Sequence, residues 1–164
     1  MIEATDRVLG VAAAQPEHES SGPAVLTATG YLLMKAAVLI GRSFDDVLDS
    51  CGLTARQFLL LSVVCESKSE SQLEVSRHLH LDPTIVVGLV DELESRGLLT
   101  RQRHPDDRRR SVLALTPAGS KLLRKATART TAAEQAFLAD LAPTEQRTFR
   151  EALARVVVPK LDQL

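Results

Sequence analysis

The chain has 164 residues, of which 45% are hydrophobic and 25% charged, and its formal net charge is −1. A chain of this length and composition suits one globular domain, or one domain with an oligomerisation extension. A net charge near zero excludes a general attraction to nucleic acid, so any such affinity has to come from a local patch. Only 3% of the residues are aromatic, so Ala, Leu and Val must build the core. This thin core favours helices and burial of apolar surface against a second copy.

Several other classes are excluded by missing motifs. The N-terminal residues lack the basic start of a signal peptide, and no apolar run approaches the length of a membrane span. Cys51 and Cys65 form neither a CxxC pair nor a disulfide framework, which favours a reducing cytoplasm. No GxSxG, HExxH or glycine-rich phosphate loop occurs, and the acidic residues are scattered. We therefore predict no enzyme activity, no cofactor and no membrane contact.

The N-terminal part is predicted to be a polar arm followed by one long helix. Residues 1–23 end in a breaker-rich run and are expected to be mobile, with room for a short helix over Ala4–Ala14. From Ala24 to Asp49, apolar residues recur at steps of three and four, which predicts a helix. Cys51 and Gly52 are expected to end it.

Two capping boxes predict where the next two helices begin. Thr54 precedes Gln57 by three residues, and Ser71 precedes Glu74 by the same spacing. The body of the first of these helices, residues 58–65, is apolar almost all round. A helix of this kind is expected to lie centrally, covered on several sides.

A third short helix is predicted to follow after a tight turn. Asp82 supplies the N-cap, Pro83 the first helical position and Gly97 the C′ residue. One face is expected to be buried and the opposite face exposed. The predicted buried stripe is Ile85, Val86, Leu89, Val90 and Leu93, and the predicted exposed face is Thr84, Val87, Gly88, Asp91 and Ser95.

Next comes an arginine-rich hairpin. Five arginines lie within residues 101–110, between strands predicted near residues 98–103 and 111–114, and Pro105 marks the tip. Positive charge is thus concentrated in one place in a chain that is otherwise not basic. A compact arginine-rich hairpin beside a helix is suited to reach a phosphate backbone or a minor groove.

Two further helices complete the chain and define the fold class. Thr116 is expected to cap a long helix to about Leu141, and a last helix is expected from Thr144 to about Val158. Ala142 is a poor N-cap, so the start of the last helix is expected to fray. We predict a mainly α fold with a small β-hairpin wing. Two short capped helices, a tight turn and a hairpin describe a winged helix-turn-helix.

The end of the hairpin resembles the wing of the MarR family of transcriptional regulators. The segment LVDELESRGLLTR, residues 89–101, is similar to the end of the family's recognition helix and the entry to its wing. The resemblance covers about residues 24–164. The family's wing motif, D-x-R-x-x-x-L-x-L-T-x-x-G, matches without a gap at Asp107, Arg109, Leu113, Leu115, Thr116 and Gly119.

This resemblance implies a homodimer that binds a pseudo-palindromic operator in double-stranded DNA, usually as a repressor. It also implies a cleft for a small-molecule effector, often anionic or phenolic, that weakens DNA binding. The implied organisation is a mobile arm at 1–23, an N-terminal dimerisation helix at 24–50, a winged helix-turn-helix DNA-binding domain at 51–116 and C-terminal dimerisation helices at 117–164.

The resemblance also implies which residues contact DNA. Arg109 matches the family's wing-tip arginine, and Asp107 is expected to orient it through a carboxylate–guanidinium pair. The N-terminus of the helix that begins at Ser71, which supports the recognition helix, is expected to contact a phosphate. The full set predicted for the wing is Arg101, Arg103, Asp107, Arg108, Arg109 and Arg110.

The recognition helix departs from the family pattern. Many members carry Ser or Thr and an Arg at its middle, where this chain has Val87 and Gly88. Thr84 is then the best base or phosphate contact, Val87 can meet a thymine methyl, and Gly88 allows close approach. Asp91 and Glu92 would repel phosphates unless they are paired. We therefore predict that the wing contributes an unusually large share of the affinity.

The effector cleft is predicted to lie between the first two helices. The alternative is that the same residues form the dimer core, with the lysine extending toward solvent. The candidates are Tyr31, Met34, Lys35, Val38, Phe58 and Ser62.

Other functions of the same fold stay open. A thiol-responsive regulator would use Cys51 or Cys65, although a buried, inert Cys65 is the favoured interpretation. A metal-responsive regulator would use His78 and His80, although surface histidines are favoured, because residues two apart on a helix diverge. A winged helix used only for protein–protein contact would not need the arginine wing.

Overall fold

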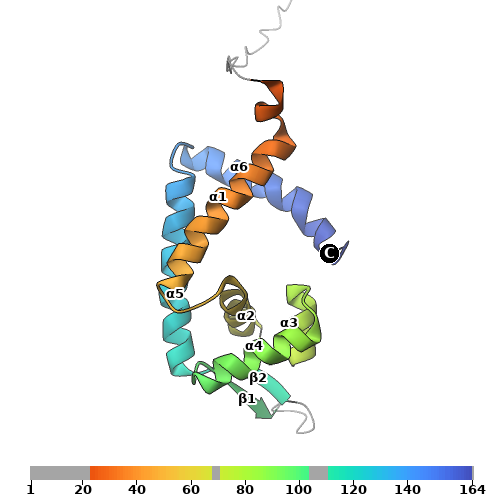
Figure 1. Cartoon of the computed structure of the whole chain (residues 1–164), viewed down its shortest axis with the longest axis vertical. Coiled ribbons are helices and arrows are strands. Elements are labelled where there is room, and N and C mark those ends of the chain that lie inside the picture. Colours follow the sequence, from red (N-terminus) through yellow and green to blue (C-terminus); the bar gives the residue numbers. More distant parts are fainter. Residues whose placement is uncertain (1–22, 68–70, 104–110, 164) are drawn as a thin grey trace, which may run out of the picture. The chain divides into compact units, whose positions relative to one another are not determined.

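The computed structural model describes residues 23–67, 71–103 and 111–163 (Figure 1). It divides into two compact units, residues 1–35 and 36–164, which are described separately. The arm at 1–23, with its expected helix over Ala4–Ala14, lies almost entirely outside the described residues.

The described part of the first unit contains a short helix and the start of a long one. The 3-10 helix η1 spans Ala24–Thr27, and α1 spans Thr29–Asp49. Ala28 between them is extended, with φ −63° and ψ 132°. The Thr27 hydroxyl donates to Ala24 O at 3.0 Å and closes the first turn locally. The α-helix predicted from Ala24 therefore begins at Thr29.

The second unit holds the remainder of α1 and all later elements (Figure 1). The single sheet of the described residues has two antiparallel strands, with Leu99 opposite Leu115 and Arg103 opposite Ser111. The mainly α fold with one β-hairpin is therefore confirmed. The elements after α1 are α2 (Ala55–Glu66), α3 (Gln72–Leu79), α4 (Pro83–Ser95), β1 (Leu99–Arg103), β2 (Ser111–Leu115), α5 (Pro117–Phe137), α6 (Pro143–Val157) and η2 (Val158–Gln163).

Both predicted capping boxes are formed. The Thr54 hydroxyl accepts from Gln57 N at 3.2 Å, and the Gln57 side chain accepts from Thr54 N at 3.0 Å. At the start of α3, Ser71 Oγ accepts from Glu74 N at 3.4 Å, and Glu74 Oε2 accepts from Ser71 N at 2.7 Å. Each box satisfies N–H groups that have no partner inside their helix. The beginnings of α2 and α3 are thus determined locally.

The core forms around α2, which packs on α3, α4, α5 and β2, as its apolar sequence predicted. Burial of α2 is nonetheless one-sided. Leu59 is 51% exposed, and Cys65 is exposed too. The prediction of a buried Cys65 was therefore wrong, because in the last turn Val64 is buried against the core and Cys65, the next residue, lies on the exposed side. The buried apolar residues are Leu48, Leu53, Leu60, Leu61, Val64, Val75, Val86, Val90, Leu93, Leu98, Leu99, Val112, Leu113, Leu123 and Ala126.

The junction of α5 and α6 differs from the prediction. Helix α5 ends at Phe137 rather than near Leu141. The Gln146 side-chain amide, in the first turn of α6, donates to Leu138 O and Leu141 O, both at 3.0 Å. These two carbonyls therefore have a hydrogen-bond partner although α5 does not continue through them. The start of α6 is also hydrogen-bonded, since Glu145 Oε2 accepts from the N–H that precedes the helix at 2.7 Å. This contact is one half of a capping box, and Ala142 has no side-chain oxygen to supply the other half.

No helix of the described residues is long and apolar enough to cross a membrane.

Candidate nucleic-acid interface

Helix α4 begins as the sequence predicted. His80 closes the turn after α3 in the left-handed region, with φ +50°. Asp82 Oδ1 then accepts from Thr84 N at 2.7 Å. Hydrogen bonds from the backbone and side chain of Thr84 lower the pKa of the Asp82 carboxyl below its ordinary value. Pro83 occupies the first position, where no N–H is needed.

The faces of α4 are nearly those predicted. Val86, Val90 and Leu93 are buried against the core, and Leu89 is partly buried. Ile85 is 39% exposed, so its placement in the buried stripe was wrong. It lies in the first turn, next to Val86, which is fully buried. The opposite face is exposed throughout, at Thr84, Val87, Gly88, Asp91 and Ser95.

The middle of this exposed face is open to an approaching partner. Val87 is 43% exposed. A Cβ placed on Gly88 would meet no atom within 4 Å. The exposed surface at the centre of α4 is therefore apolar, and no side chain of the described residues covers it.

The base of the hairpin is locked to the end of α4 by the predicted wing motif. The Thr116 hydroxyl donates to Gly97 O at 2.7 Å and accepts from Gly119 N at 3.0 Å. Thr116 N donates to Leu98 O at 3.1 Å. A Cβ on Gly119 would lie 1.9 Å from Leu98 O, so no larger residue fits there without a shift of the backbone. The spacing T-x-x-G is thus the joint between hairpin, α4 and α5.

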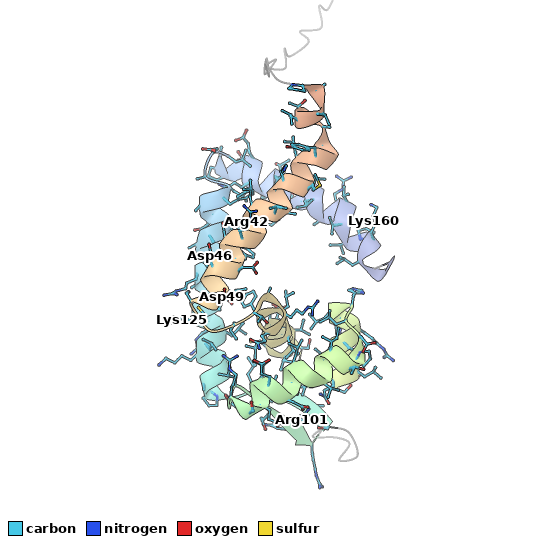
Figure 2. All side chains as sticks on the ribbon, in the orientation of Figure 1. Arg42, Asp46, Asp49, Arg101, Lys125 and Lys160 are labelled. Carbon is cyan, nitrogen blue, oxygen red and sulfur yellow. The ribbon has the colours of Figure 1, made fainter. Side chains whose placement is uncertain are left out.

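Arg101 ties the hairpin to the C-terminal half of α4 (Figure 2). Its guanidinium donates to the carboxylates of Asp91 and Glu94, and its backbone N–H donates to Glu94 Oε1 at 3.1 Å. The pair with Asp91, and then that with Glu94, raise the pKa of the guanidinium above its ordinary value. The contact of Arg101 with DNA stays a prediction. In the free chain its charge is directed at α4.

Arg96 links the C-terminal end of α4 to the start of α2, a role that the sequence analysis missed. Its Nη2 donates to Gly52 O at 2.6 Å, and its Nη1 donates to the buried side chain of Gln57 at 3.3 Å. Its Nη1 also lies 3.8 Å from Glu92 Oε1. The sequence signal was the spacing of Glu92 and Arg96, which is that of an i, i+4 ion pair.

The acidic residues of α4 are therefore paired, which was the condition stated for them. Asp91 and Glu94 face Arg101, and Glu92 lies beside Arg96. Their repulsion of phosphates is reduced without any charge from outside the domain.

The remaining predicted DNA contacts differ in how far their side chains are already hydrogen-bonded. Ser71 Oγ donates to Glu74 Oε2 at 2.8 Å, so this hydroxyl is engaged in the capping box. Arg103 is exposed at the end of β1, and its side chain has no hydrogen bond or ion pair within the described part of the chain. Asp107, Arg108, Arg109 and Arg110 lie outside the described residues. All of these stay predictions.

The predicted effector residues are divided between the two units. In the first, Lys35 Nζ lies 5.3 Å from the centre of the Tyr31 ring, and Met34 is exposed. The other three candidates, Val38, Phe58 and Ser62, belong to the second unit. Val38 is exposed, Phe58 packs against the core, and the Ser62 hydroxyl donates to Phe58 O at 2.9 Å.

The cysteines and histidines offer little chemistry. His78 and His80 are exposed, as predicted. No group of three or more His, Cys, Asp or Glu side chains is placed to hold a metal within residues 23–67, 71–103 and 111–163. Cys51 is partly buried, and its Sγ lies 4.0 Å from Arg129 Nη1.

Known proteins share this arrangement. A family model described as "MarR family" matches residues 53–111. CouR from Rhodococcus jostii RHA1, solved bound to p-coumaroyl-CoA, is 33% identical with a TM-score of 0.70, covering 80% of this chain and 93% of that chain. The Mycobacterium tuberculosis MarR family protein Rv2887, solved in complex with DNA, is 27% identical with a TM-score of 0.68, covering 79% and 98%. PcaV from Streptomyces coelicolor, solved with its natural ligand, is 29% identical with a TM-score of 0.66, covering 83% and 96%.

Two capped helices joined by a tight turn, followed by a hairpin fixed to the second helix, define a winged-helix DNA-binding protein. The relatives are DNA-binding transcriptional regulators, so the prediction that the chain is not an enzyme is confirmed. The chain belongs to the MarR family of transcriptional regulators.

Proposed function

We propose that the chain is a ligand-responsive repressor that binds a pseudo-palindromic operator as a homodimer. The observation that carries this proposal is the open face of α4 beside a hairpin that Arg101 holds against it. Helices of this kind enter the major groove, and the wing reaches the backbone or the minor groove. The relative Rv2887 is described as an HTH-type transcriptional repressor, and it is 28% identical over 77% of this chain and 91% of its own length.

A second copy is the expected partner of the helices outside the DNA-binding domain. Contiguous exposed apolar side chains on a protein mark an interaction surface. In this proposal residues 24–50 and 117–164 form the dimer, and residues 51–116 form each DNA-binding lobe. The exposed apolar residues in the dimerisation helices include Leu32, Leu33, Met34, Val38 and Leu39 of α1 and Phe149, Val156 and Val157 of α6.

The effector is proposed to be a small anionic or phenolic molecule in the cytoplasm. CouR was solved with p-coumaroyl-CoA, which is both phenolic and anionic. Lys35 and Tyr31 offer a cation and a hydroxyl on adjacent turns of α1, which suits such a ligand. In this proposal they bind it together with Met34, Val38, Phe58 and Ser62. Binding changes the separation of the two lobes, so both α4 helices no longer fit successive major grooves.

The first test is selection of bound duplexes from a fragment library of the source genome. We expect a two-fold symmetric consensus, and affinity that falls steeply as salt rises because phosphate contacts release counterions. Binding without sequence preference would contradict the proposal. Candidate aromatic acids and their CoA thioesters are then added to the selected complex. An effector of the proposed class should release the DNA, and a Lys35→Ala variant should need more of it.

The share of the wing in DNA binding is tested by two single variants. Arg109→Ala should weaken operator binding more than Thr84→Ala does, because α4 offers few polar contacts of its own. A smaller loss for Arg109→Ala would contradict the proposed dominance of the wing.

One observation favours a second candidate, a thiol-responsive regulator. Cys65 is exposed and therefore open to oxidants. In this case hydrogen peroxide, which oxidises a single thiolate to a sulfenic acid and is itself reduced to water, would release the selected DNA from the wild-type protein and leave a Cys65→Ser variant bound.

A further inference from the structure

Helix α4 carries no side chain that reads guanine or adenine in the usual way. Residues 83–95 contain no Arg, Lys, Asn or Gln. These are the residue types that form two hydrogen bonds with guanine or adenine in the major groove. A recognition helix without them has to obtain its sequence preference from other contacts.

The carboxylates of α4 are also engaged. Asp and Glu can accept a hydrogen bond from the amino group of cytosine. Here Asp91 and Glu94 both accept from Arg101, and Glu92 lies beside Arg96. Reading cytosine would require these ion pairs to break. Arg96 and Arg101 are held by the same contacts in the free chain and point at their partners rather than outward.

Thr84 lies at the start of the open face of α4 and is exposed. Its backbone N–H donates to Asp82 Oδ1 at 2.7 Å, so the cap fixes its backbone in the first turn of α4. The Thr84 side chain carries a methyl group as well as a hydroxyl, and a threonine methyl can contact an apolar group in the major groove.

An apolar strip remains on the exposed face of α4. Thr84, Val87 and Gly88 follow at the i, i+3, i+4 spacing, which places them side by side on one face. Val87 is exposed, and the space above Gly88 is open, so a flat surface can come close to the helix here. The one apolar group that bases present in the major groove is the C5-methyl of thymine.

We propose that α4 reads thymine methyl groups through Val87 and the methyl of Thr84, while Gly88 lets the helix backbone approach the groove. This inference rests on the proposed function, since it requires α4 to enter the major groove. Sequence preference under α4 is then a preference for thymine at fixed positions, without a guanine contact from the helix.

The experiment compares thymine with deoxyuridine, which differs only by the C5-methyl group. A consensus duplex is first selected from a random library with the full-length protein. Each thymine of one half-site is then replaced singly by deoxyuridine, and binding is measured by fluorescence anisotropy. At one or two positions we expect affinity to fall about three- to fivefold, the effect of one buried methyl group.

A protein variant links that loss to Val87. Val87→Ala should weaken binding to the thymine duplex by a similar factor, and deoxyuridine at the sensitive position should then cost little more. Val87 is exposed, so the substitution leaves the core unchanged, which urea unfolding checks. Leu59→Ala, at an exposed apolar position on α2, is the matched control and should keep the full deoxyuridine loss.

The outcomes separate this inference from the function on which it rests. Selection that yields no consensus contradicts the proposed regulator itself. A consensus whose affinity is unchanged by deoxyuridine at every position overturns the thymine-methyl contact but leaves the regulator standing. An undiminished deoxyuridine loss in Val87→Ala overturns the role of Val87.

Discussion

Arg101 is part of the arginine cluster in the sequence, but in the structure its side chain is paired with two carboxylates of α4. Its neighbour on the same strand, Arg103, is exposed and has no side-chain partner within the described residues. The difference comes from position along the hairpin. Arg101 lies near its base, where Asp91 and Glu94 of α4 are within reach. Equal charges in one short segment therefore have different roles.

Arg101→Ala is expected to weaken operator binding without changing its salt dependence. The variant leaves Asp91 unpaired on the DNA-facing side and loosens the hairpin. Ion pairs at this degree of exposure contribute about 0.5–1 kcal/mol, so we expect about a two- to fivefold loss of affinity. The slope of log affinity against log salt should stay at the wild-type value, because no phosphate contact is lost.

Arg103→Ala is the matched control for that measurement. If Arg103 meets a phosphate, its loss should reduce the salt slope by about one ion. A similar reduction in Arg101→Ala would show that Arg101 leaves α4 for the DNA backbone.

Gly119→Ala is expected to destabilise the fold severely. The added Cβ would overlap Leu98 O, which is backbone and cannot rotate away. We expect the free energy of unfolding to fall by about 3 kcal/mol or more, measured by urea denaturation. Gly88→Ala is the contrasting variant, since its Cβ enters open space within a helix. It should stabilise the protein by up to about 1 kcal/mol.

At the scale of elements, the N-caps explain why the first residues of the capped helices were predicted correctly. Thr54, Ser71, Asp82 and Thr116 each accept a backbone N–H as their spacing predicted. Such contacts span two or three residues, so the sequence contains both partners. Helix ends were less predictable, because the end of α5 depends on Gln146, eight residues after Leu138.

The cap of α4 gives a pH-dependent prediction. Hydrogen bonds from Thr84 lower the pKa of Asp82 in the folded state, so the ionised carboxylate stabilises the fold. This contribution is fully present above the ordinary aspartate pKa of about 3.9 and is lost as pH falls through the lower folded value. Asp82→Ala should therefore unfold at a lower urea concentration than wild type at pH 7. The difference should shrink below about pH 4; an unchanged difference at pH 3 would contradict this account.

Burial within elements was predicted well in their middles and poorly at their ends. Ile85 in the first turn of α4 and Cys65 in the last turn of α2 were both expected inside and are exposed. Helical periodicity gives the direction of a side chain about its axis. It does not say how wide a face of the helix the neighbouring elements cover, and Val86 and Val64, next to these two residues, are buried.

At the scale of the whole molecule, the apolar surface of α6 predicts association. Val157→Asp places a charge where the proposed dimer buries an apolar side chain. We expect the dimer dissociation constant to rise by about two orders of magnitude, measured by sedimentation equilibrium. Operator affinity should fall with it, since one lobe reads only half a site.

Leu59→Asp is the control for dimer formation. It makes the same kind of change at an exposed apolar position of α2, outside the proposed dimerisation helices. It should leave the dimer intact. A wild-type protein that sediments as a monomer at micromolar concentration would contradict the proposed assembly.

The sequence by itself determined the order of elements, three of the helix caps that matter for the DNA-binding domain and the family, through the wing motif that ends at Gly119. The caps are local features, in which the interacting residues lie within a few positions of each other, and the wing motif is a fixed spacing that can be read along the chain. Only the tertiary structure decided what the charged residues do. Arg96 reaches Gly52, 44 residues away, and Arg101 crosses from the hairpin to α4. Side-chain pairing between elements depends on their packing, and composition cannot show which arginines are left for DNA.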